Sequence, residues 1–401
     1  MEKHWRRKRK ICIVTSVHQA LDSRIFYKEA SSLAAAGHDV ILIGRHDKKE
    51  TVDGVDILPL PKPKNRLSRL AALTTLLMKA HKQHAHVYHF HDPELLLLGP
   101  WLKLTTRCKL IFDAHEDVKE QINDKQWIPK PLRRIISFIY VRLERQMLRF
   151  FDAVIIAEDS YMPNFAYFHN IICIHNYPLL TDEPPPRRPG DLSQLVYVGG
   201  LSRDRGALTL VSAIELVRQT HRVKLLLAGP TYSPEFQRAL EARIAESDLK
   251  CNIETPGKVP FPKGQEFIRS AGIGLACLHP VPNNVGSLVT KLFEYMAAGL
   301  PIVASNFPLW EKLFTRTRCG LTVDPLDPRA IASAITWLMD HPDQAREMGA
   351  NGRQAVLCKY NWTLEKDRLI EFYERLIDGQ KVLDLGESSN PQEPIRARDK
   401  Q

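Results

Sequence analysis

The stretch VTKLFEYMAAGLP, residues 289–301, decides the fold of the C-terminal half of the chain. At 3.6 residues per turn, Leu292 and Met296 fall on one side of a helix, whereas Lys291 and Glu294 fall on another. The Gly-Leu-Pro that follows is typical of a helix end. The polar stripe is either an exposed Lys–Glu pair, worth a few tenths of a kcal/mol, or a contact with a ligand.

Short apolar runs and helical patterns alternate on both sides of this helix. In the second half, the runs QLVYVGG, VKLLLAG, IGLACL, PIVAS and GLTV alternate with helical patterns over residues 207–218, 234–246 and 288–298. In the first half, the runs are KICIVTS, HDVILIG, HVYHF, CKLIFDA, DAVIIAE and NIICIHN, with helical patterns over residues 24–36 and 67–84. This alternation predicts two α/β domains, each a doubly wound parallel sheet covered by helices on both faces.

The proline-rich stretch YPLLTDEPPPRRPGD interrupts the alternation and is typical of a linker. We therefore predict five segments. Residues 1–178 and 194–358 form the two domains, and residues 179–193 link them. Residues 359–378 form a helix that packs back on the first domain, and residues 379–401 form a disordered tail.

Composition and charge describe an ordinary globular protein with a basic excess. The chain has 401 residues, 44% of them hydrophobic, and a net charge of +10, which favours anionic partners such as nucleotides, nucleic acid or an anionic membrane. Its seven scattered cysteines include no C-x-x-C pair, which favours reduced core residues in the cytosol. We see no signal peptide and no apolar run of about 18 residues, so a soluble or peripheral protein is expected.

Two loops that follow predicted strands could hold an anion. In VGGLSRDRGA, residues 198–207, Gly199 and Gly200 would let the backbone approach a ligand closely, and Arg205 adds positive charge. The alternative is a simple tight turn. In VPNNVGS, residues 281–287, the last two residues precede the helix that carries the polar stripe, where the helix dipole favours an anion. A lysine in that stripe suits a phosphate, and a carboxylate can accept both hydroxyls of a ribose.

These motifs resemble the retaining glycosyltransferase family 4, which has the GT-B fold. The resemblance rests on TKLFEYMAAGLPIVAS and VYVGGLSRDRG, and it covers roughly residues 10–378. The stretches SVHQALDSRIFYKEASSLAAAGHDV, HFHDPELLLLG and FDAHEDVKEQ resemble a bacterial branch that is active in surface-polysaccharide assembly. The resemblance implies two Rossmann-like domains that face one another across a cleft.

The resemblance also implies a role for individual residues. The expected catalytic residues are His115, Arg205 and Lys291, with His115 beside the donor sugar and the two cations on the diphosphate. The ribose would be bound by Glu294, and the full set of expected donor-binding residues is Gly199, Gly200, Arg205, Gly286, Ser287, Lys291 and Glu294. Residues expected to bind the acceptor or line the cleft are His18, Asp22, Arg24, His91, Asp92 and Glu116.

The chain departs from the family pattern at two positions. Family members often carry a glutamate where this chain has Gly286, and an arginine where it has Gly200. The first difference removes a usual contact with the sugar hydroxyls. The second leaves Lys291 and Arg205 with more of the diphosphate charge.

The histidine-rich stretch HKQHAHVYHFHDPE raises the question of a metal site. His89 and His91 would share one face of a strand, but a third ligand is not evident from the sequence. We therefore expect no metal and no cofactor beyond a nucleoside diphosphate sugar as substrate. His115, which follows the strand CKLIFDA, is the strongest candidate outside the second domain, with a purely structural histidine as the alternative.

The stretch KPLRRIISFIYVRLERQMLRF, residues 130–150, predicts a basic amphipathic helix. Together with HWRRKRK near the N-terminus it could rest on anionic lipid. The alternative is a core helix with a solvated arginine face.

The function we predict is transfer of a sugar to an acceptor hydroxyl, with retention of the anomeric configuration. The acceptor would be a lipid-linked saccharide or polysaccharide precursor, and the enzyme would be cytoplasmic or peripheral on the inner face of the plasma membrane. One alternative is a sugar-nucleotide epimerase of the same fold. Another is a non-catalytic protein that binds nucleic acid or a membrane through its basic charge, although we expect no nucleic-acid partner because the basic residues are not interleaved with aromatic ones.

Overall fold

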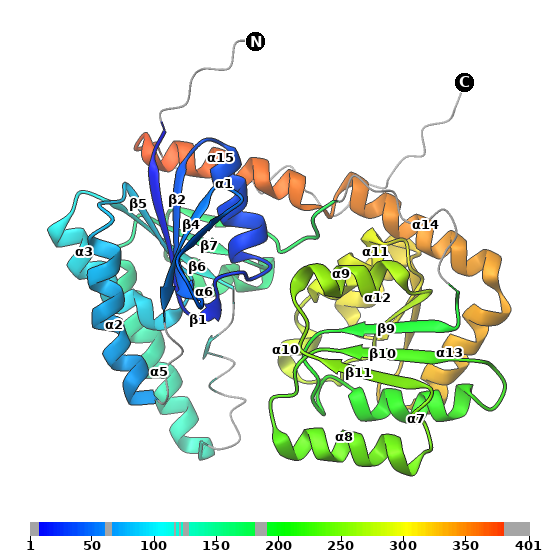
Figure 1. Cartoon of the computed structure of the whole chain (residues 1–401). Helices are drawn as coiled ribbons and strands as arrows, with labels where there is room; N and C mark the ends of the chain where they lie inside the picture. Colours follow the sequence, from blue (N-terminus) through cyan, green and yellow to red (C-terminus); the bar gives the residue numbers. More distant parts are fainter. Residues whose placement is uncertain are drawn as a thin grey trace, which may run out of the picture. The chain divides into compact units, whose positions relative to one another are not determined.

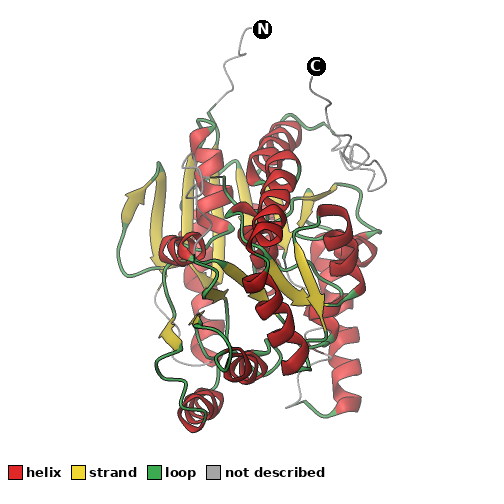
Figure 2. Ribbon diagram, turned by 90° about the vertical axis from the view of Figure 1, so that its right-hand side faces the viewer, coloured by secondary structure: helices red, strands yellow, loops and turns green. Residues whose placement is uncertain are grey.

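The computed structural model describes residues 8–60, 66–115, 118, 119, 122, 128–180 and 191–380. The chain divides into two compact units, and each is an α/β unit with its strands inside and its helices outside (Figures 1 and 2). The first unit extends to His175 and takes up the chain again from Lys366. The second unit spans Asn176–Glu365.

The first unit is built on an eight-stranded sheet with the order β3-β4-β2-β1-β5-β6-β7-β8. Its strands are parallel except for the pair β3–β4. They are β1 (Lys10–Gln19), β2 (Asp39–Arg45), β3 (Glu50–Val52), β4 (Val55–Leu60), β5 (Val87–Phe90), β6 (Lys109–Ala114), β7 (Ala153–Ile156) and β8 (Ile171–Cys173). The chain moves outward from β1 in both directions, so the carboxyl ends of β1 and β5 lie at the switch point, where α/β sheets commonly bind ligands.

Helices connect these strands. A π-helical turn (Ile25–Ala30) leads into α1 (Ser31–Ala35), so the helix predicted over residues 24–36 is not a continuous α-helix. The others are α2 (Arg66–His81), a 3₁₀ helix (Pro93–Leu98), α3 (Gly99–Thr105), α5 (Lys130–Leu148), a 3₁₀ turn (Asp159–Tyr161), α6 (Met162–Phe165) and, from Lys366 on, α15 (Trp362–Ile377).

The second unit contains a six-stranded, fully parallel sheet with the order β11-β10-β9-β12-β13-β14. The strands are β9 (Gln194–Val198), β10 (Lys224–Ala228), β11 (Ile253–Gly257), β12 (Ile273–Ala276), β13 (Ile302–Ser305) and β14 (Gly320–Val323). Its helices are α7 (Ala207–Val217), α8 (Pro234–Glu246), α9 (Phe261–Ser270), α10 (Pro282–Val285), α11 (Thr290–Ala297), α12 (Pro308–Thr317), α13 (Pro328–Asp340) and α14 (Pro342–Cys358). The two sheets confirm the predicted pair of Rossmann-like domains.

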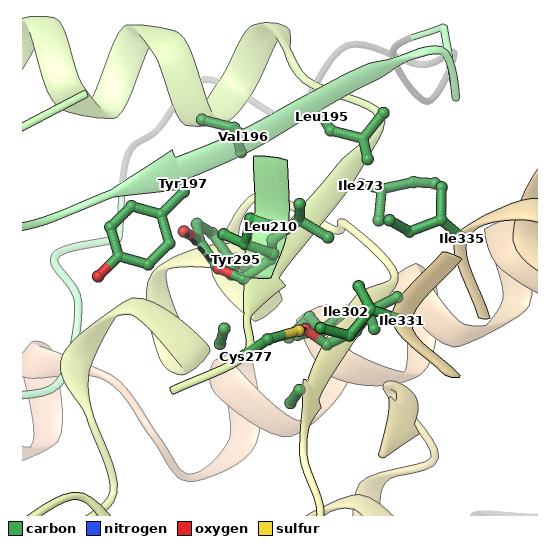
Figure 3. Close-up of a cluster of buried hydrophobic side chains, with 14 of the residues drawn as sticks. Leu195, Val196, Tyr197, Leu210, Ile273, Cys277, Tyr295, Ile302, Ile331 and Ile335 are labelled. Carbon is green, nitrogen blue, oxygen red and sulfur yellow. Dashed lines mark hydrogen bonds between the residues drawn. The ribbon is translucent and has the colours of Figure 1, made fainter. Parts of the chain in front are cut away.

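The core of the second unit holds α11 in place (Figure 3). Tyr295 of α11 is fully buried, and its hydroxyl accepts a hydrogen bond from the backbone N–H of Val198 (3.1 Å) and donates one to the carbonyl of Leu275 (3.3 Å). These bonds tie α11 to the carboxyl end of β9 and to β12. The polar stripe on α11 is therefore positioned by the sheet itself.

Five of the seven cysteines are buried, as a core role predicts, whereas Cys251 and Cys358 are exposed. Within the described ranges, no helix combines the length and the apolar character that crossing a bilayer requires.

Candidate functional site

The glycine loop after β9 lies directly against Lys291. Gly199 has φ +139°, and a Cβ atom at this position would lie 3.0 Å from Lys291 Nζ. A Cβ atom at Gly200 would lie 2.6 Å from the ring of Tyr232. The exposed side chain of Tyr232 therefore lies over Gly200 and would have to move to admit a larger residue there.

Lys291 is a buried cation near the start of α11. Its side chain is 7% exposed, and Nζ lies 3.5 Å from the centroid of the Tyr197 ring. Among the described residues, the ammonium group forms no ion pair or hydrogen bond. Burial, and then the charge of Arg205, holds the pKa of Lys291 well below the ordinary lysine value, although Glu294 acts in the opposite direction. Such a site favours an anionic ligand, because an anion would compensate the buried charge.

Arg205 adds a second positive charge to this site. Its backbone N–H donates to Ser202 Oγ (3.2 Å). The loop that carries it is held against α10, because Asn284 Nδ2 donates to the carbonyl of Asp204 (3.1 Å) and to that of His279 (2.9 Å). Arg205 of the glycine loop and Lys291 of α11 are thus close enough for their charges to affect one another.

Glu294 lies one turn from Lys291, and its carboxylate is oriented from a neighbouring helix. Gln265 Nε2 of α9 donates a hydrogen bond of 2.9 Å to Glu294 Oε1. The sequence did not point to Gln265, because the contact joins residues 29 positions apart on two helices. The carboxylate is half-buried and held in one orientation, which suits a contact with neighbouring hydroxyl groups.

Gly286 and Ser287 lie in the turn between α10 and α11 rather than inside a helix. The helix predicted from residue 288 begins at Thr290. The carbonyl of Ser287 accepts a hydrogen bond from Trp310 Nε1 (2.7 Å), which fixes the turn. A Cβ atom at Gly286 would meet only the carbonyl oxygen of Pro282, at 3.5 Å, so this glycine is not required for steric reasons.

A buried charge cluster occupies the carboxyl ends of β1, β5 and β6 in the first unit. Arg24 is 4% exposed and binds two fully buried carboxylates, with Nη2 at 2.7 Å from Asp113 Oδ2 and Nε at 2.9 Å from Glu29 Oε1. Its Nη1 donates to the carbonyl of Ile174 (2.9 Å). Burial by itself would raise the pKa of Asp113, but Arg24 and the neighbouring histidines outweigh this and hold it well below the usual range.

Two fully buried histidines complete the inner part of the cluster. His91 Nε2 lies 3.4 Å from Glu29 Oε2, and His89 Nε2 lies 3.7 Å from Asp113 Oδ2. The other ring nitrogen of His89 is within 2.8 Å of the hydroxyl of Tyr373, in α15. Burial raises the pKa of Glu29 and lowers that of His91, so burial favours a neutral form of both groups.

A histidine pair forms the outer part of the cluster. His115 Nδ1 lies 3.5 Å from Asp113 Oδ1, and its Nε2 lies 3.1 Å from His18 Nε2. Both side chains are partly exposed, and so is Asp22. Asp113 therefore orients the histidine pair from below, and the pair presents imidazole groups at the surface of the first unit.

The other predicted first-unit residues lie deeper. The exposed fractions of Arg24, His91 and Asp92 are 4%, 1% and 2%, so burial argues against direct ligand contact and favours a supporting role. Asp92 Oδ2 accepts hydrogen bonds from Thr15 Oγ1 (2.8 Å) and from the backbone N–H of Ser16 (2.6 Å). Glu116 lies outside the described residues.

The cluster also supplies metal-ligand types that the sequence did not reveal. Donor atoms of Glu29, His89, His91 and Asp113 lie within 4.8 Å of one another. Glu29 comes from a π-helical turn and Asp113 from β6, and both lie far from the two histidines in sequence. Both carboxylates already contact the Arg24 guanidinium, and a divalent cation would lie close to that positive charge. The absence of a metal stays a prediction.

Comparison with known proteins identifies the architecture. The model of the family described as "Glycosyl transferases group 1" matches residues 193–341, and that of the "Glycosyl transferase 4-like domain" matches residues 23–162. The chain is a GT-B glycosyltransferase. The matched regions include the β9 loop and α11 in one unit and, in the other, the buried cluster apart from His18.

Individual relatives of this glycosyltransferase are distant. It is 24% identical to an MMP alpha-(1->4)-mannosyltransferase from Mycolicibacterium hassiacum, over 72% of this chain and 70% of that protein. Its alignments with several other curated glycosyltransferases span less than half of their length. Among solved structures, sucrose-phosphate synthase from Thermosynechococcus elongatus has a TM-score of 0.69 at 19% identity, with coverage of 93% of this chain and all of that one. The Anabaena Alr3699/HepE structure in complex with UDP-glucose has a TM-score of 0.66 at 14% identity, with coverage of 91% and 99%.

Proposed function

We propose that the protein transfers a sugar from a nucleoside diphosphate sugar to an acceptor hydroxyl, with retention of the anomeric configuration. The observation that carries this proposal is the buried cation Lys291, which lies against the Gly199 backbone with Arg205 beside it. A diphosphate would compensate the positive charge of Lys291 and Arg205. One turn further along α11, Glu294 is placed to accept the hydroxyls of a ribose.

The proposed reaction breaks the bond between C1 of the sugar and the diphosphate oxygen. Negative charge develops on the leaving diphosphate, and Lys291 and Arg205 would stabilise it. The acceptor oxygen would form its bond to C1 on the same face, and its proton would pass to the leaving phosphate. The His18–His115 pair of the first unit would bind sugar hydroxyls.

For the acceptor we propose a lipid-linked saccharide or polysaccharide precursor, used at the cytoplasmic face of the membrane in surface-polysaccharide assembly. The support comes from the motifs of the first unit that resemble that branch, and from the net charge of +10. The epimerase hypothesis is not favoured, because the matching family models describe glycosyl transferases. A nucleic-acid binder would leave the arrangement of Lys291, Glu294 and Gln265 unexplained.

A thermal-shift panel of sugar nucleotides tests the donor. A ligand at 100 times its dissociation constant should stabilise the protein by about 2.7 kcal/mol. NMR of the product from the best donor would then show its anomeric configuration. An inverted linkage would contradict the retaining mechanism, and isomerisation of the donor without any acceptor would favour the epimerase.

The depressed pKa of Lys291 predicts that donor affinity falls as pH rises. The diphosphate favours the charged ammonium, so above the pKa of the free enzyme, binding must take up a proton. The same shift predicts that the stability of the free enzyme rises with pH between this pKa and the ordinary lysine value, because the unfolded chain then binds more protons. Titration calorimetry in two buffers of different ionisation enthalpy measures the proton uptake. Lys291→Arg stays charged and should therefore bind the donor without proton uptake. An unchanged proton uptake in this variant would show that another group takes up the proton.

Gln265→Ala should weaken donor binding by about tenfold, because it removes a hydrogen bond to a charged carboxylate. Titration calorimetry with the donor that the thermal-shift panel identifies measures the change in affinity. The matched control is Gln237→Ala on α8, where Gln237 Nε2 makes the same type of bond to Glu241 (3.0 Å) on an exposed surface. A nucleotide that lacks the ribose 2′-hydroxyl should show a smaller difference between wild type and Gln265→Ala. Equal losses with both nucleotides would argue that Gln265 does not act through the ribose.

A further inference from the structure

Helix α5 buries Leu148 together with two polar residues on its inner side and carries large apolar residues on its outer side. Ser137 and Glu144 are buried against the first unit, and Glu144 accepts a hydrogen bond of 2.6 Å from the hydroxyl of Tyr140. Six large apolar side chains are between 40% and 60% exposed: Leu132, Ile135, Ile136, Phe138, Ile139 and Leu143. A surface helix in a soluble protein turns its apolar stripe toward the core, whereas these six side chains of α5 face outward.

The exposed apolar residues form a continuous stripe. Leu132, Ile136, Ile139 and Leu143 follow one another at spacings of three and four residues, which places them on one side of the helix. The alternative of a core helix with a solvated arginine face therefore does not describe α5, because none of the other described residues covers this stripe.

Positive charge runs along one flank of the stripe. Arg134, Arg142, Arg145 and Arg149 are exposed, and none of them forms an ion pair with another described residue. Arg142 lies over the ring of Phe138, 4.9 Å from its centroid. Glu144 is the sole acidic residue of α5, and it is buried. The outer face thus combines apolar side chains with uncompensated arginines.

The neighbouring helix α3 also exposes apolar side chains. Helix α3 packs against α5, and both lie on the same side of the first unit (Figure 1). Trp101 and Leu104 of α3 are 42% and 81% exposed, and Leu97 of the preceding 3₁₀ helix is 46% exposed. An exposed apolar stripe such as that of α5 is unusual for a surface that faces only water.

We propose that the outer face of α5 is a docking surface for an anionic lipid bilayer. A bilayer offers hydrocarbon and anionic phosphate within a few ångströms of one another, which matches the juxtaposition of Leu, Ile and Phe with arginine along one helix. A second copy of this chain would offer the apolar area but would place the arginines against the same arginines. The proposal does not rest on the transferase activity, since lipid binding is measured without substrate.

Flotation of the full chain with phosphatidylcholine vesicles, with and without phosphatidylglycerol, tests this surface. Binding should require phosphatidylglycerol and weaken with salt. Arg142→Gln with Arg149→Gln should weaken binding by about 25-fold, at about fivefold for each arginine. Ile135→Ser with Ile139→Ser should weaken it by about tenfold or more.

Matched controls carry the same changes elsewhere on exposed residues. Arg238→Gln with Arg346→Gln removes the same charge from the second unit, and Leu357→Ser with Leu364→Ser removes apolar side chains there. Both should bind vesicles as wild type does, and all four variants should keep the wild-type melting temperature. Absence of binding to anionic vesicles at low salt, equal losses in the controls, or self-association of wild type that the α5 variants abolish would each overturn the proposal.

Discussion

Lys291→Ala should lower turnover by about 10²–10³-fold and leave the protein folded. In the proposed reaction, the loss follows from removing a charge that would stabilise the leaving diphosphate. The melting temperature of the free protein should not fall, because the variant also removes the cost of burying an unpaired cation. Steady-state kinetics and thermal unfolding without ligand measure the two effects.

Lys263 provides the matched control for this experiment. It is a half-exposed lysine on α9 that pairs with Glu266 at 2.7 Å, so Lys263→Ala should have near-normal turnover. If Lys291→Ala also kept near-normal turnover, the assignment of the anion site would be wrong. A drop in melting temperature of the free protein would show instead that the ammonium group stabilises the fold.

Arg24→Met should destabilise the first unit by about 3–5 kcal/mol. The guanidinium is the shared partner of Asp113 and Glu29, both fully buried, and its loss leaves the charge of Asp113 uncompensated. Hydrogen exchange of peptides from β1 and β6 reports the stability of this unit separately from the other. The His18–His115 pair should also lose its fixed orientation, since Asp113 supports it.

Two further variants separate charge from packing. The triple variant Arg24→Met, Asp113→Asn, Glu29→Gln removes all three ionisable groups and should recover most of the lost stability. Arg107→Met changes an exposed arginine of the same unit and should stay within about 0.5 kcal/mol of wild type. A loss below about 1 kcal/mol for Arg24→Met, or no recovery in the triple variant, would contradict the role of Arg24 as a shared counter-ion.

The regular elements followed from the sequence where periodicity was strong. The helix predicted over residues 234–246 agrees with α8, because Ser233 caps it, Pro234 begins it and apolar residues repeat at helical spacing. The hairpin of β3 and β4 was missed because its strands are short, although the Asp53-Gly54 pair at positive φ is a typical hairpin signal. The strand β11 was missed because exposed polar residues break its apolar run.

The chemical site was predictable only in part. Local sequence placed Lys291 and Glu294 on one helical stripe, because their spacing alone decides this. Which groups surround the stripe depends on contacts between residues far apart in the chain: Tyr197 under the ammonium, Tyr232 over Gly200, and Gln265 on the carboxylate.

The amino-acid sequence by itself therefore determined the two α/β domains and the types of group available for binding a diphosphate and a ribose, since both depend on periodicity and spacing within short segments. Only the tertiary structure decided which charges are buried and which apolar faces stay exposed. It placed Arg24 and His91 in a buried cluster and turned the apolar side of α5 outward. Burial is the physical reason for this division, because the environment of a side chain is set by elements distant in sequence.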